Sequence, residues 1–318
     1  MAALMPELVG HDAAMARFMR SMHEGRLHHA WLLYGMRGVG KSMLASRMAA
    51  TYLCDAPTAH GPCGECHGCR IGAAGAHPDM RLVALEEGKR DISIEQVREL
   101  LAFLSLSGSE SIRRVVVLQD AEQLNVQAAN ALLKGLEEPA PGSLLLIVCN
   151  DLMRLPATIR SRCMLEHCAP LNDTDMRRVL AGMDIDAAFS ELVLHLAHGC
   201  PGRVQCLTDA RIGEALLAWQ RLTADIAATD LGAVQDWMGR HLDVVPHALV
   251  ADIVLDRLQD QLQASLLAGG RDGYPDDVFD AAEGLARWPQ AVQRHSLRPA
   301  TSLFAHMMQL RRVLKAAA

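Results

Sequence analysis

The feature that most constrains the fold of this 318-residue chain is a glycine-rich pattern near its N-terminus. Residues 35–42 read G-x-x-x-x-G-K-S, directly after the apolar run Trp31–Tyr34 and before a helical stretch at Met43–Ala50. In such a loop, backbone amides curl around phosphates, Lys41 reaches the outer phosphates and Ser42 ligates magnesium. A plain glycine-rich turn is the alternative. The predicted nucleotide-binding residues are Gly35, Gly38, Gly40, Lys41 and Ser42.

More buried strands are predicted within the first 168 residues. The further apolar runs are Arg81–Leu85, Arg114–Leu118 and Leu144–Val148. These runs are too continuous for strands with one solvent-exposed face, so they suit buried parallel strands. The stretches between them have the length of helices. One predicted helix opens with a capping box at Ser93–Gln96, and another is stopped by Pro139. The pattern predicts a doubly wound α/β domain with a parallel sheet.

After Pro170 the strand signals end and amphipathic helical patterns follow. The predicted helices span Met176–Met183, Ala187–His198, Gly213–Ala228, Pro246–Leu267 and Pro299–Lys315. Surface turns are predicted at Gly269–Gly270 and Gly273–Asp277. The second half is therefore expected to be all-helical, a small piece followed by a larger bundle.

Composition excludes several other classes. The longest clear apolar run, Leu144–Cys149, is far shorter than the roughly 18 residues that a membrane span needs. A net charge of −6 argues against a globally basic nucleic-acid binder and leaves a local basic face as the alternative. Nine cysteines with no export signal indicate a reduced cytoplasm, where clustered cysteines bind metal more often than they pair.

Four of the cysteines form a candidate metal site with the spacing C-x8-C-x2-C-x2-C. Glycines and a Pro62 turn between them let the sulfurs converge on one tetrahedral ion. Four thiolates leave no open position, so the spacing predicts a structural zinc site at Cys54, Cys63, Cys66 and Cys69. Four unrelated free thiols are the alternative, and the five remaining cysteines are expected to be small core residues.

The strand at Val115–Leu118 ends in an incomplete magnesium signature. A hydrolysing ATPase of this type carries an Asp for magnesium there, followed by a Glu that activates water. Here Gln119 stands in the place of the Asp and Asp120 in the place of the Glu. A one-residue slip would instead make Asp120 the magnesium ligand. Either alignment predicts nucleotide binding without efficient hydrolysis.

Arg162 lies in Ser161-Arg162-Cys163, after a predicted strand and a short helix at Leu155–Arg160. On the residues alone, a solvated surface charge is the favoured interpretation of this arginine, because nothing in the periodicity selects it.

Together these features resemble one family, the AAA+ subunits of the bacterial DNA polymerase III clamp loader. The resemblance is carried by the phosphate-binding loop, the four-cysteine insert, Arg26–Ala30, His77–Asp79, Asn130–Pro139 and Ser161–Cys163. It is dense over the first 170 residues and rests on size and pattern beyond them.

Within this family the chain is more similar to the delta-prime type than to the hydrolysing gamma/tau type. The Asp-Glu pair of the gamma type is missing at Gln119–Asp120, and Gly202 stands where a lid arginine is expected, with Arg203 one residue late. A long tail for polymerase or helicase contact is also missing. The complete phosphate-binding loop instead favours the gamma/tau type, because that loop is degenerate in some delta-prime subunits.

The resemblance implies three parts: an AAA+ core at residues 1–168 with a zinc-binding insert at 54–69, a helical lid at 169–210, and a helical collar for oligomerisation at 211–318. It implies a hetero-pentameric ring with gamma/tau and delta subunits. Within the DNA polymerase III holoenzyme, this ring loads the sliding clamp onto primed DNA during replication.

The resemblance also implies the role of this chain in the ring. A delta-prime subunit is its rigid, non-catalytic stator, and Arg162 would act in trans on the neighbouring gamma ATP site. The implied cofactors are structural zinc and ATP with magnesium, bound without efficient hydrolysis. The implied location is the bacterial cytoplasm, with no membrane partner.

Two alternatives stay open. One is a hydrolysing gamma/tau-type clamp-loader ATPase, and the other is a free-standing P-loop ATPase or kinase with a structural zinc. A kinase usually has a mobile basic lid, and no arginine-rich lid is found. Magnesium-dependent turnover by the purified chain alone would favour the free-standing class.

Overall fold

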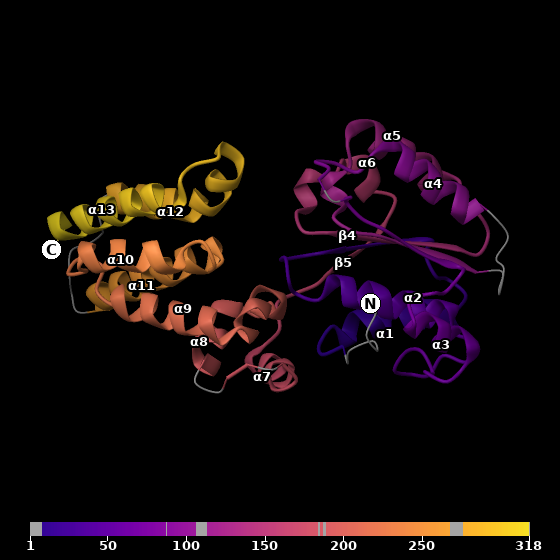
Figure 1. Cartoon of the computed structure of the whole chain (residues 1–318). Helices are drawn as coiled ribbons and strands as arrows, with labels where there is room; N and C mark the ends of the chain where they lie inside the picture. Colours follow the sequence, from indigo (N-terminus) through magenta and orange to yellow (C-terminus); the bar gives the residue numbers. More distant parts are fainter. Residues whose placement is uncertain are drawn as a thin grey trace. The chain divides into compact units, whose positions relative to one another are not determined.

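The computed structural model describes residues 8–86, 88–105, 113–183, 185–186, 189–267 and 276–317. The chain divides into two compact units (Figure 1). The first unit comprises Met1–Val179 together with His198–Arg203, and the second comprises Leu180–Ala197 and Val204–Ala318. The segment His198–Arg203 therefore belongs with the first unit, although Leu180–Ala197 of the second unit precedes it in sequence.

The first unit is built on a five-stranded, all-parallel sheet with the order β2-β3-β4-β1-β5. The strands are β1 (Ala30–Tyr34), β2 (Met80–Val83), β3 (Arg114–Leu118), β4 (Ser143–Cys149) and β5 (Met164–His167). The first four are the strands that the apolar runs predict. The edge strand β5 was not predicted, because two of its four side chains, Met164 and Leu165, are more than 40% exposed. It is held instead by the buried Glu166, which accepts a 3.0 Å hydrogen bond from Nε of Arg17.

Helices cover both faces of this sheet, as a doubly wound domain requires (Figure 1). The helices of this unit are α1 (Asp12–His23), α2 (Lys41–Leu53), α3 (His67–Ala73), α4 (Ile94–Ser105), α5 (Val126–Glu137) and α6 (Ala157–Arg160), with short 3-10 turns at Ala121–Gln123, Leu152–Arg154 and Pro201–Arg203. The helix α7 (Asp173–Ala181) begins in this unit and ends in the second. Trp31 and Leu33 of β1 pack in the core under α1 and α2, whereas Leu32 packs in the core under α4 and α5. Both faces of the central strands are thus buried, which explains their unbroken apolar sequences.

The helix ends follow the local sequence signals. At the start of α4, the Ser93 amide donates to Oε1 of Gln96 (3.0 Å) and the Gln96 amide contacts Oγ of Ser93 (3.4 Å), which confirms the capping box. At α5, the Asn125 side chain accepts a 2.8 Å hydrogen bond from the Ala128 amide, and the helix ends at Glu137, two residues before Pro139. These caps fix the helices on one face of the sheet.

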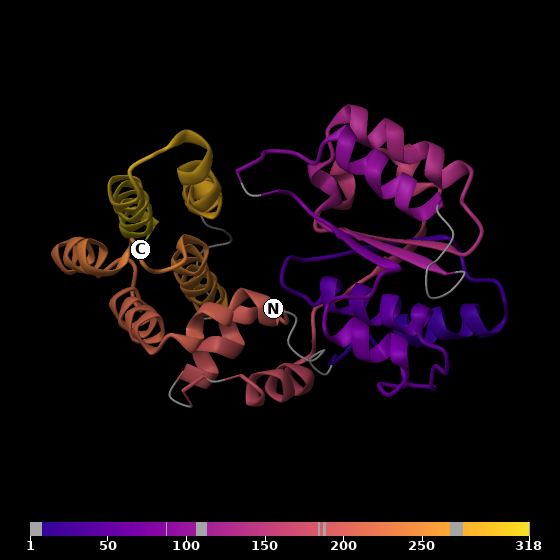
Figure 2. The same cartoon turned by 45° about the vertical axis from the view of Figure 1, so that its right-hand side comes forward.

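The described part of the second unit is helical. Its helices are α8 (Ser190–Ala197), α9 (Ala210–Leu222), α10 (Leu231–His241), α11 (His247–Leu267), α12 (Asp276–His295) and α13 (Pro299–Ala317), with a 3-10 turn at Gln205–Thr208. Tryptophans join them: Nε1 of Trp219 donates to the Val250 carbonyl (3.0 Å), and its ring centroid lies 4.5 Å from that of Trp237. The two long C-terminal helices, yellow in Figures 1 and 2, pack side by side, and Nε1 of Trp288 donates to Oγ of Ser302 (2.8 Å).

Several sequence predictions for this unit need correction. The helix expected over Gly213–Ala228 ends at Leu222, and α10 was not predicted at all. The turn expected at Gly273–Asp277 is contradicted at its end, because α12 begins at Asp276. The predicted Gly269–Gly270 turn lies outside the described residues. None of the described helices is both long and apolar enough to cross a membrane.

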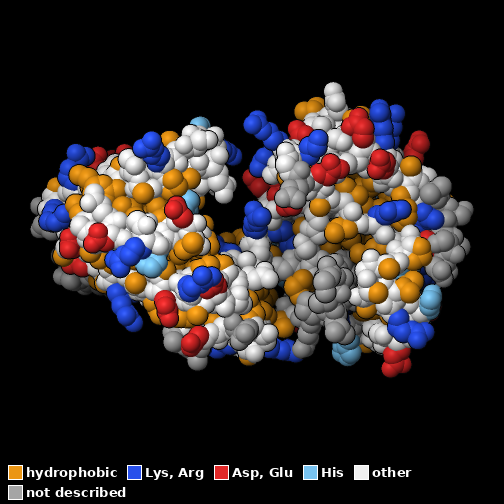
Figure 3. Space-filling view, viewed as in Figure 1, with side chains coloured by type: hydrophobic (Ala, Val, Ile, Leu, Met, Phe, Trp, Pro, Cys, Tyr) orange, Lys and Arg blue, Asp and Glu red, His pale blue; other side chains and the backbone are white. Residues whose placement is uncertain are grey.

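Charges of both signs are interspersed over the face of the molecule in Figure 3. This agrees with the modest net charge of −6.

Candidate functional site: a closed phosphate-binding loop and a four-cysteine cluster

The glycine-rich loop joins β1 to α2, where the sequence places it. Its three glycines, the two of the pattern and Gly38 between them, all have positive φ: 149° at Gly35, 84° at Gly38 and 107° at Gly40. A side chain at Gly35 would also collide with the backbone oxygen of Cys168. Glycine is therefore required by conformation at these positions and, at Gly35, by space as well.

Lys41 is buried inside this loop, with only 4% of its surface exposed. Its ammonium donates three hydrogen bonds of 2.8 Å each, to the carbonyl oxygens of Gly35 and Met36 and to Oδ1 of Asn150. An ammonium has three donors, so these acceptors satisfy it fully. Burial lowers the pKa of Lys41 below its ordinary value, although the nearby Glu122 opposes this shift.

Ser42 and Gln119 face each other across the site. The Ser42 hydroxyl donates to Oε1 of Gln119 at 2.6 Å, so Gln119 occupies the position opposite the serine that would ligate magnesium. Asp120, with φ 47°, turns to Asn150 instead, where its Oδ1 accepts from Nδ2 at 3.0 Å. A neutral amide is a weaker ligand for hard Mg²⁺ than a carboxylate. Of the two alignments open in the sequence, this geometry supports the one with Gln119 at the magnesium position.

Two further residues of the site, Asn150 and Glu122, were not singled out from the sequence. Asn150 follows β4, and its Nδ2 donates to Oε1 of Glu122 (2.7 Å) as well as to Asp120. The backbone N–H of Asn150 donates to Oε2 of the same glutamate at 3.1 Å. The signal that could have found Asn150 is its position just beyond a buried parallel strand, the edge at which sites of open α/β sheets gather.

The 3-10 turn Pro201–Arg203 contacts the phosphate-binding loop. The amide of Gly202 donates to the carbonyl oxygen of Gly38 at 2.9 Å. On another side, Nε2 of His11 lies 2.9 Å from the carbonyl oxygen of Val39. Gly202, which stands where the resemblance to gamma-type subunits predicts an arginine, is thus in direct contact with the phosphate-binding loop.

The four cysteines of the insert converge as their spacing predicts. The sulfurs of Cys54, Cys63, Cys66 and Cys69 all lie within 4.8 Å of one another. The Cys54–Cys66 and Cys63–Cys69 sulfur pairs are each 3.9 Å apart. Four sulfurs at about 2.3 Å from one tetrahedral zinc are separated by about 3.8 Å, so the cluster matches that ion.

Backbone N–H groups donate to sulfurs of this cluster, an arrangement that suits thiolates binding a cation. The amides of Cys63, Cys66 and Cys69 point at the sulfurs of Cys54, Cys63 and Cys66, at 3.3 to 3.4 Å. The backbone N–H groups of Cys66 and Glu65 lower the pKa of the Cys63 thiol to about 6, whereas burial raises the pKa of Cys54 and Cys69. The other five cysteines are buried or half-buried, and burial raises the pKa of each: Cys149, Cys163, Cys168, Cys200 and Cys206.

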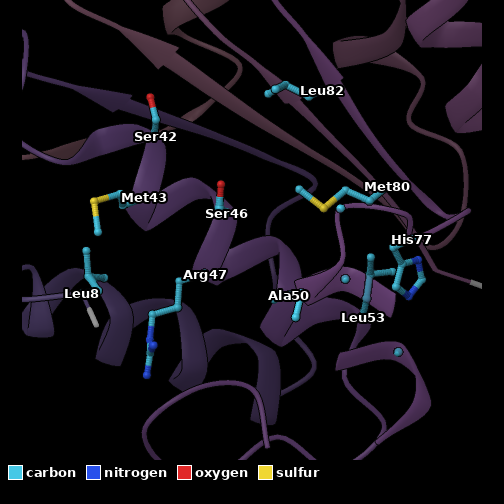
Figure 4. Close-up of a pocket in the computed structure, with 14 residues that line it drawn as sticks. Leu8, Ser42, Met43, Ser46, Arg47, Ala50, Leu53, His77, Met80 and Leu82 are labelled. Atoms are coloured by element: carbon cyan, nitrogen blue, oxygen red, sulfur yellow. The ribbon is translucent and has the colours of Figure 1, made fainter. Parts of the chain in front are cut away.

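A largely apolar cavity of about 470 Å³ lies between α2, β2 and the cysteine insert (Figure 4). Ser42 and Met43 line it near the phosphate-binding loop, and Leu53 and His77 line it near the insert. The side chain of Leu82 on the edge strand β2 is 63% exposed.

Arg162 lies at the end of α6, on the surface. Its Nη2 pairs with Oε1 of Glu137 at 2.8 Å, and its Nη1 donates to the Thr158 carbonyl at 3.1 Å. The arginine side chain is 38% exposed and that of Glu137 is 51% exposed. Arg162 is therefore partly exposed at the surface, and these two partners of its guanidinium lie outside the phosphate-binding loop.

The fold and the site define a P-loop α/β domain whose magnesium position carries an amide. Comparison with known proteins gives the family. Residues 10–172, a little over half of the chain, match the family model described as "DNA polymerase III, delta subunit". The chain belongs to that family, and delta′ subunits are among the relatives that it matches.

The chain is 47% identical to the delta′ subunit of Pseudomonas aeruginosa over 140 residues, which is 44% of this chain and 43% of that protein. It is 36% identical to Escherichia coli delta′ over 195 residues, 60% of this chain and 58% of the other. The match therefore spans about half the length of these relatives. A tau/gamma subunit of Haemophilus influenzae is 30% identical over 236 residues, 72% of this chain and 33% of its own length.

Among solved structures, a gamma subunit-related protein of DNA polymerase III from Thermotoga maritima is 14% identical to this chain. The alignment covers 95% of this chain and 99% of that one, with a TM-score of 0.45.

Proposed function

We propose that this chain is the delta′ stator of a DNA polymerase III clamp loader. In this proposal it joins gamma/tau and delta subunits in a hetero-pentameric ring that places the sliding clamp on primed DNA, in the bacterial cytoplasm. The observation that carries the proposal is Gln119, whose amide faces Ser42 at 2.6 Å in a chain of the delta-subunit family. A subunit without a magnesium carboxylate at this position suits a stator better than a motor.

The proposed division of labour follows the three predicted parts. Residues 1–168 form the AAA+ core, 169–210 the lid and 211–318 the collar through which the ring assembles. The described helices beyond β5 support a helical lid and collar. The four-cysteine insert holds one structural zinc, and the two sulfur pairs that lie 3.9 Å apart, within a cluster spanning at most 4.8 Å, support this assignment.

Nucleotide is proposed to bind without efficient turnover. When bound, ATP with magnesium would offer a phosphate group to Lys41 and the metal ion to Ser42. Gln119 offers that metal ion no negative charge. The residues fit such a ligand only if Lys41 exchanges a carbonyl partner for a phosphate oxygen, because all three of its donors are in use. We expect ATP affinity to drop in Lys41→Ala and turnover by the isolated chain to stay at background.

The catalytic contribution of this chain is proposed to be Arg162, in trans. A guanidinium can pair two phosphate oxygens and stabilise charge on a phosphoryl group in transfer. The partial exposure of Arg162, whose guanidinium partners lie outside the phosphate-binding loop, supports a role toward a neighbouring subunit.

Reconstitution by omission tests the proposed function. A loader assembled from gamma/tau and delta subunits, with or without this chain, is assayed for clamp loading on primed DNA. We expect loading only when the chain is present. Full loading in its absence, or steady ATP hydrolysis by the chain alone, would contradict the stator role and favour a free-standing or gamma-type ATPase.

A further inference from the structure

Arg162 and its ion-pair partner Glu137 come from two segments whose backbones are anchored in the core. Glu137 is the last residue of α5, and its neighbour Leu136 is only 3% exposed. The carbonyl oxygen of Leu136 lies 3.0 Å from Nε2 of His29, the residue before β1. Arg162 follows α6, where its backbone N–H donates to the carbonyl oxygen of the fully buried Ile159 at 3.1 Å. Both backbones are therefore held by the packed domain, and the two side chains bridge them.

Three contacts within the chain set the direction of the Arg162 guanidinium. Nη2 pairs with Oε1 of Glu137 at 2.8 Å. Nη1 donates to the carbonyl oxygen of Thr158 at 3.1 Å and lies 3.5 Å from Oγ of Ser161. A guanidinium has five N–H donors, so these contacts leave two of them, including the Nε–H, for an acceptor outside this chain.

Glu137 is the one charged partner among these three. A hydrogen bond between ionised groups is about twice as strong as one between neutral groups, so this pair contributes most to the orientation. A long arginine side chain loses much rotamer freedom when it is held against a phosphate. A contact that orders the side chain beforehand reduces this entropic cost of binding. The position of Glu137 is therefore suited to prepare Arg162 for a phosphate.

We propose that Glu137 is the positioning residue of Arg162, and that it directs the guanidinium toward the phosphates of ATP bound to a neighbouring subunit. Glu137 contacts neither the nucleotide nor the reacting atoms, and it acts through Arg162 alone. This inference rests on the proposed role of Arg162 in trans and adds to it the residue that sets the direction of the arginine.

The expected effect is modest, because water reaches both side chains. They are 38% and 51% exposed, and ion pairs of this kind change an equilibrium by a factor of at most about five. Glu137→Gln keeps an oxygen in place but removes its charge. We expect this variant to lower the Arg162-dependent part of kcat, which is the part that Arg162→Ala removes, by about two- to fivefold. KM for ATP should stay unchanged, because a contact made with the phosphoryl group in transfer affects kcat.

A double-mutant cycle in the reconstituted ring tests the proposal. Rings of gamma/tau, delta and this chain carry the wild type, Glu137→Gln, Arg162→Ala or both changes. Their kcat and KM for ATP are measured with sliding clamp and primed DNA, after equal assembly is confirmed. We expect a lower kcat in Glu137→Gln, and a double variant that is no slower than Arg162→Ala alone. An unchanged kcat, losses that add in the double variant, or a higher kcat, as expected of a carboxylate that competes with the phosphate, would overturn the proposal.

Glu138→Gln is the matched control, because it removes the same charge from the next residue of the chain. No ion pair joins Glu138 to Arg162 in the described part of the chain. The control should leave kcat unchanged, and a loss equal to that of Glu137→Gln would overturn the proposal in favour of a general charge effect. If Arg162→Ala itself leaves kcat unchanged, the proposed role in trans fails, and this inference fails with it. If Arg162→Ala lowers kcat and Glu137→Gln does not, only the positioning role fails.

Discussion

Removing two ligands of the four-cysteine cluster should abolish zinc binding and loosen the insert while the sheet stays folded. The change is Cys63→Ser with Cys66→Ser, which leaves only two of the four sulfurs. Structural zinc contributes about 10–16 kcal/mol of apparent binding free energy in small peptides, enough to order the insert, and this energy depends on the full set of thiolate ligands. We therefore expect the metal to be lost completely.

The damage should be local, because of where the cysteines sit. None of the four belongs to the two apolar clusters that line the faces of the sheet. Cys54 directly follows Leu53, the last residue of α2, and only Cys54 and Cys69 are fully buried. Loss of the ion should therefore release residues 54–73 up to the end of α3 and leave the strands protected.

Metal analysis and amide exchange measure the two parts of this prediction. The wild type should hold one zinc per chain and the double variant none, with faster exchange confined to residues 54–73. Cys206→Ser, a substitution outside the cluster, is the control and should change neither. Full zinc stoichiometry in the double variant would refute the assignment. Loss of protection throughout the sheet would refute the argument that the insert is independent of the core.

Three further predictions follow from particular contacts. Arg162→Ala should leave folding and assembly intact, because exposed ion pairs contribute about 0–1 kcal/mol. It should nevertheless lower the ATPase rate of the reconstituted ring in part. Equal rates for the variant and the wild type would mean that Arg162 is only a solvated surface charge. Asn125→Ala removes the N-cap of α5 and should cost about 1 kcal/mol in urea unfolding; a change within error would mean that the cap is redundant. Burial, and then the nearby His28, lower the pKa of His29 below 6.5 in the folded chain. The unfolded chain therefore binds this proton more readily, and stability is lost as the pH falls through this range. His29→Gln should flatten the change in Tm between about pH 7.5 and about pH 5.5, and an unchanged slope would contradict this argument.

The parts of the fold that were predictable are those in which local chemistry and tertiary packing agree. Buried parallel strands need apolar side chains on both faces, so β1, β3 and β4 can be recognised as continuous runs. The edge strand β5 alternates little and exposes Met164 and Leu165, so its sequence lacks that signal. The helix α12 was missed because Pro289 lies inside it and acidic residues open it in a turn-like sequence.

The site was predictable where a residue type is dictated by spacing. The phosphate-binding loop and the four cysteines depend on sequence-local patterns, so they could be identified directly. Asn150 and Glu122 come together only when β4 is placed beside β3, a pairing that one sequence does not encode locally. The contact of Gly202 with Gly38 joins positions 164 residues apart and required the structure.

The central claim, that the chain is the stator of a clamp loader, is tested most directly by assembly. Native mass spectrometry of the full chain mixed with the gamma/tau and delta subunits of its host bacterium gives the composition of the complex. The account predicts a five-subunit ring containing one copy of this chain, formed without ATP hydrolysis by it. A chain that stays outside the complex, or that enters in several copies in the positions of the gamma subunits, would contradict the account.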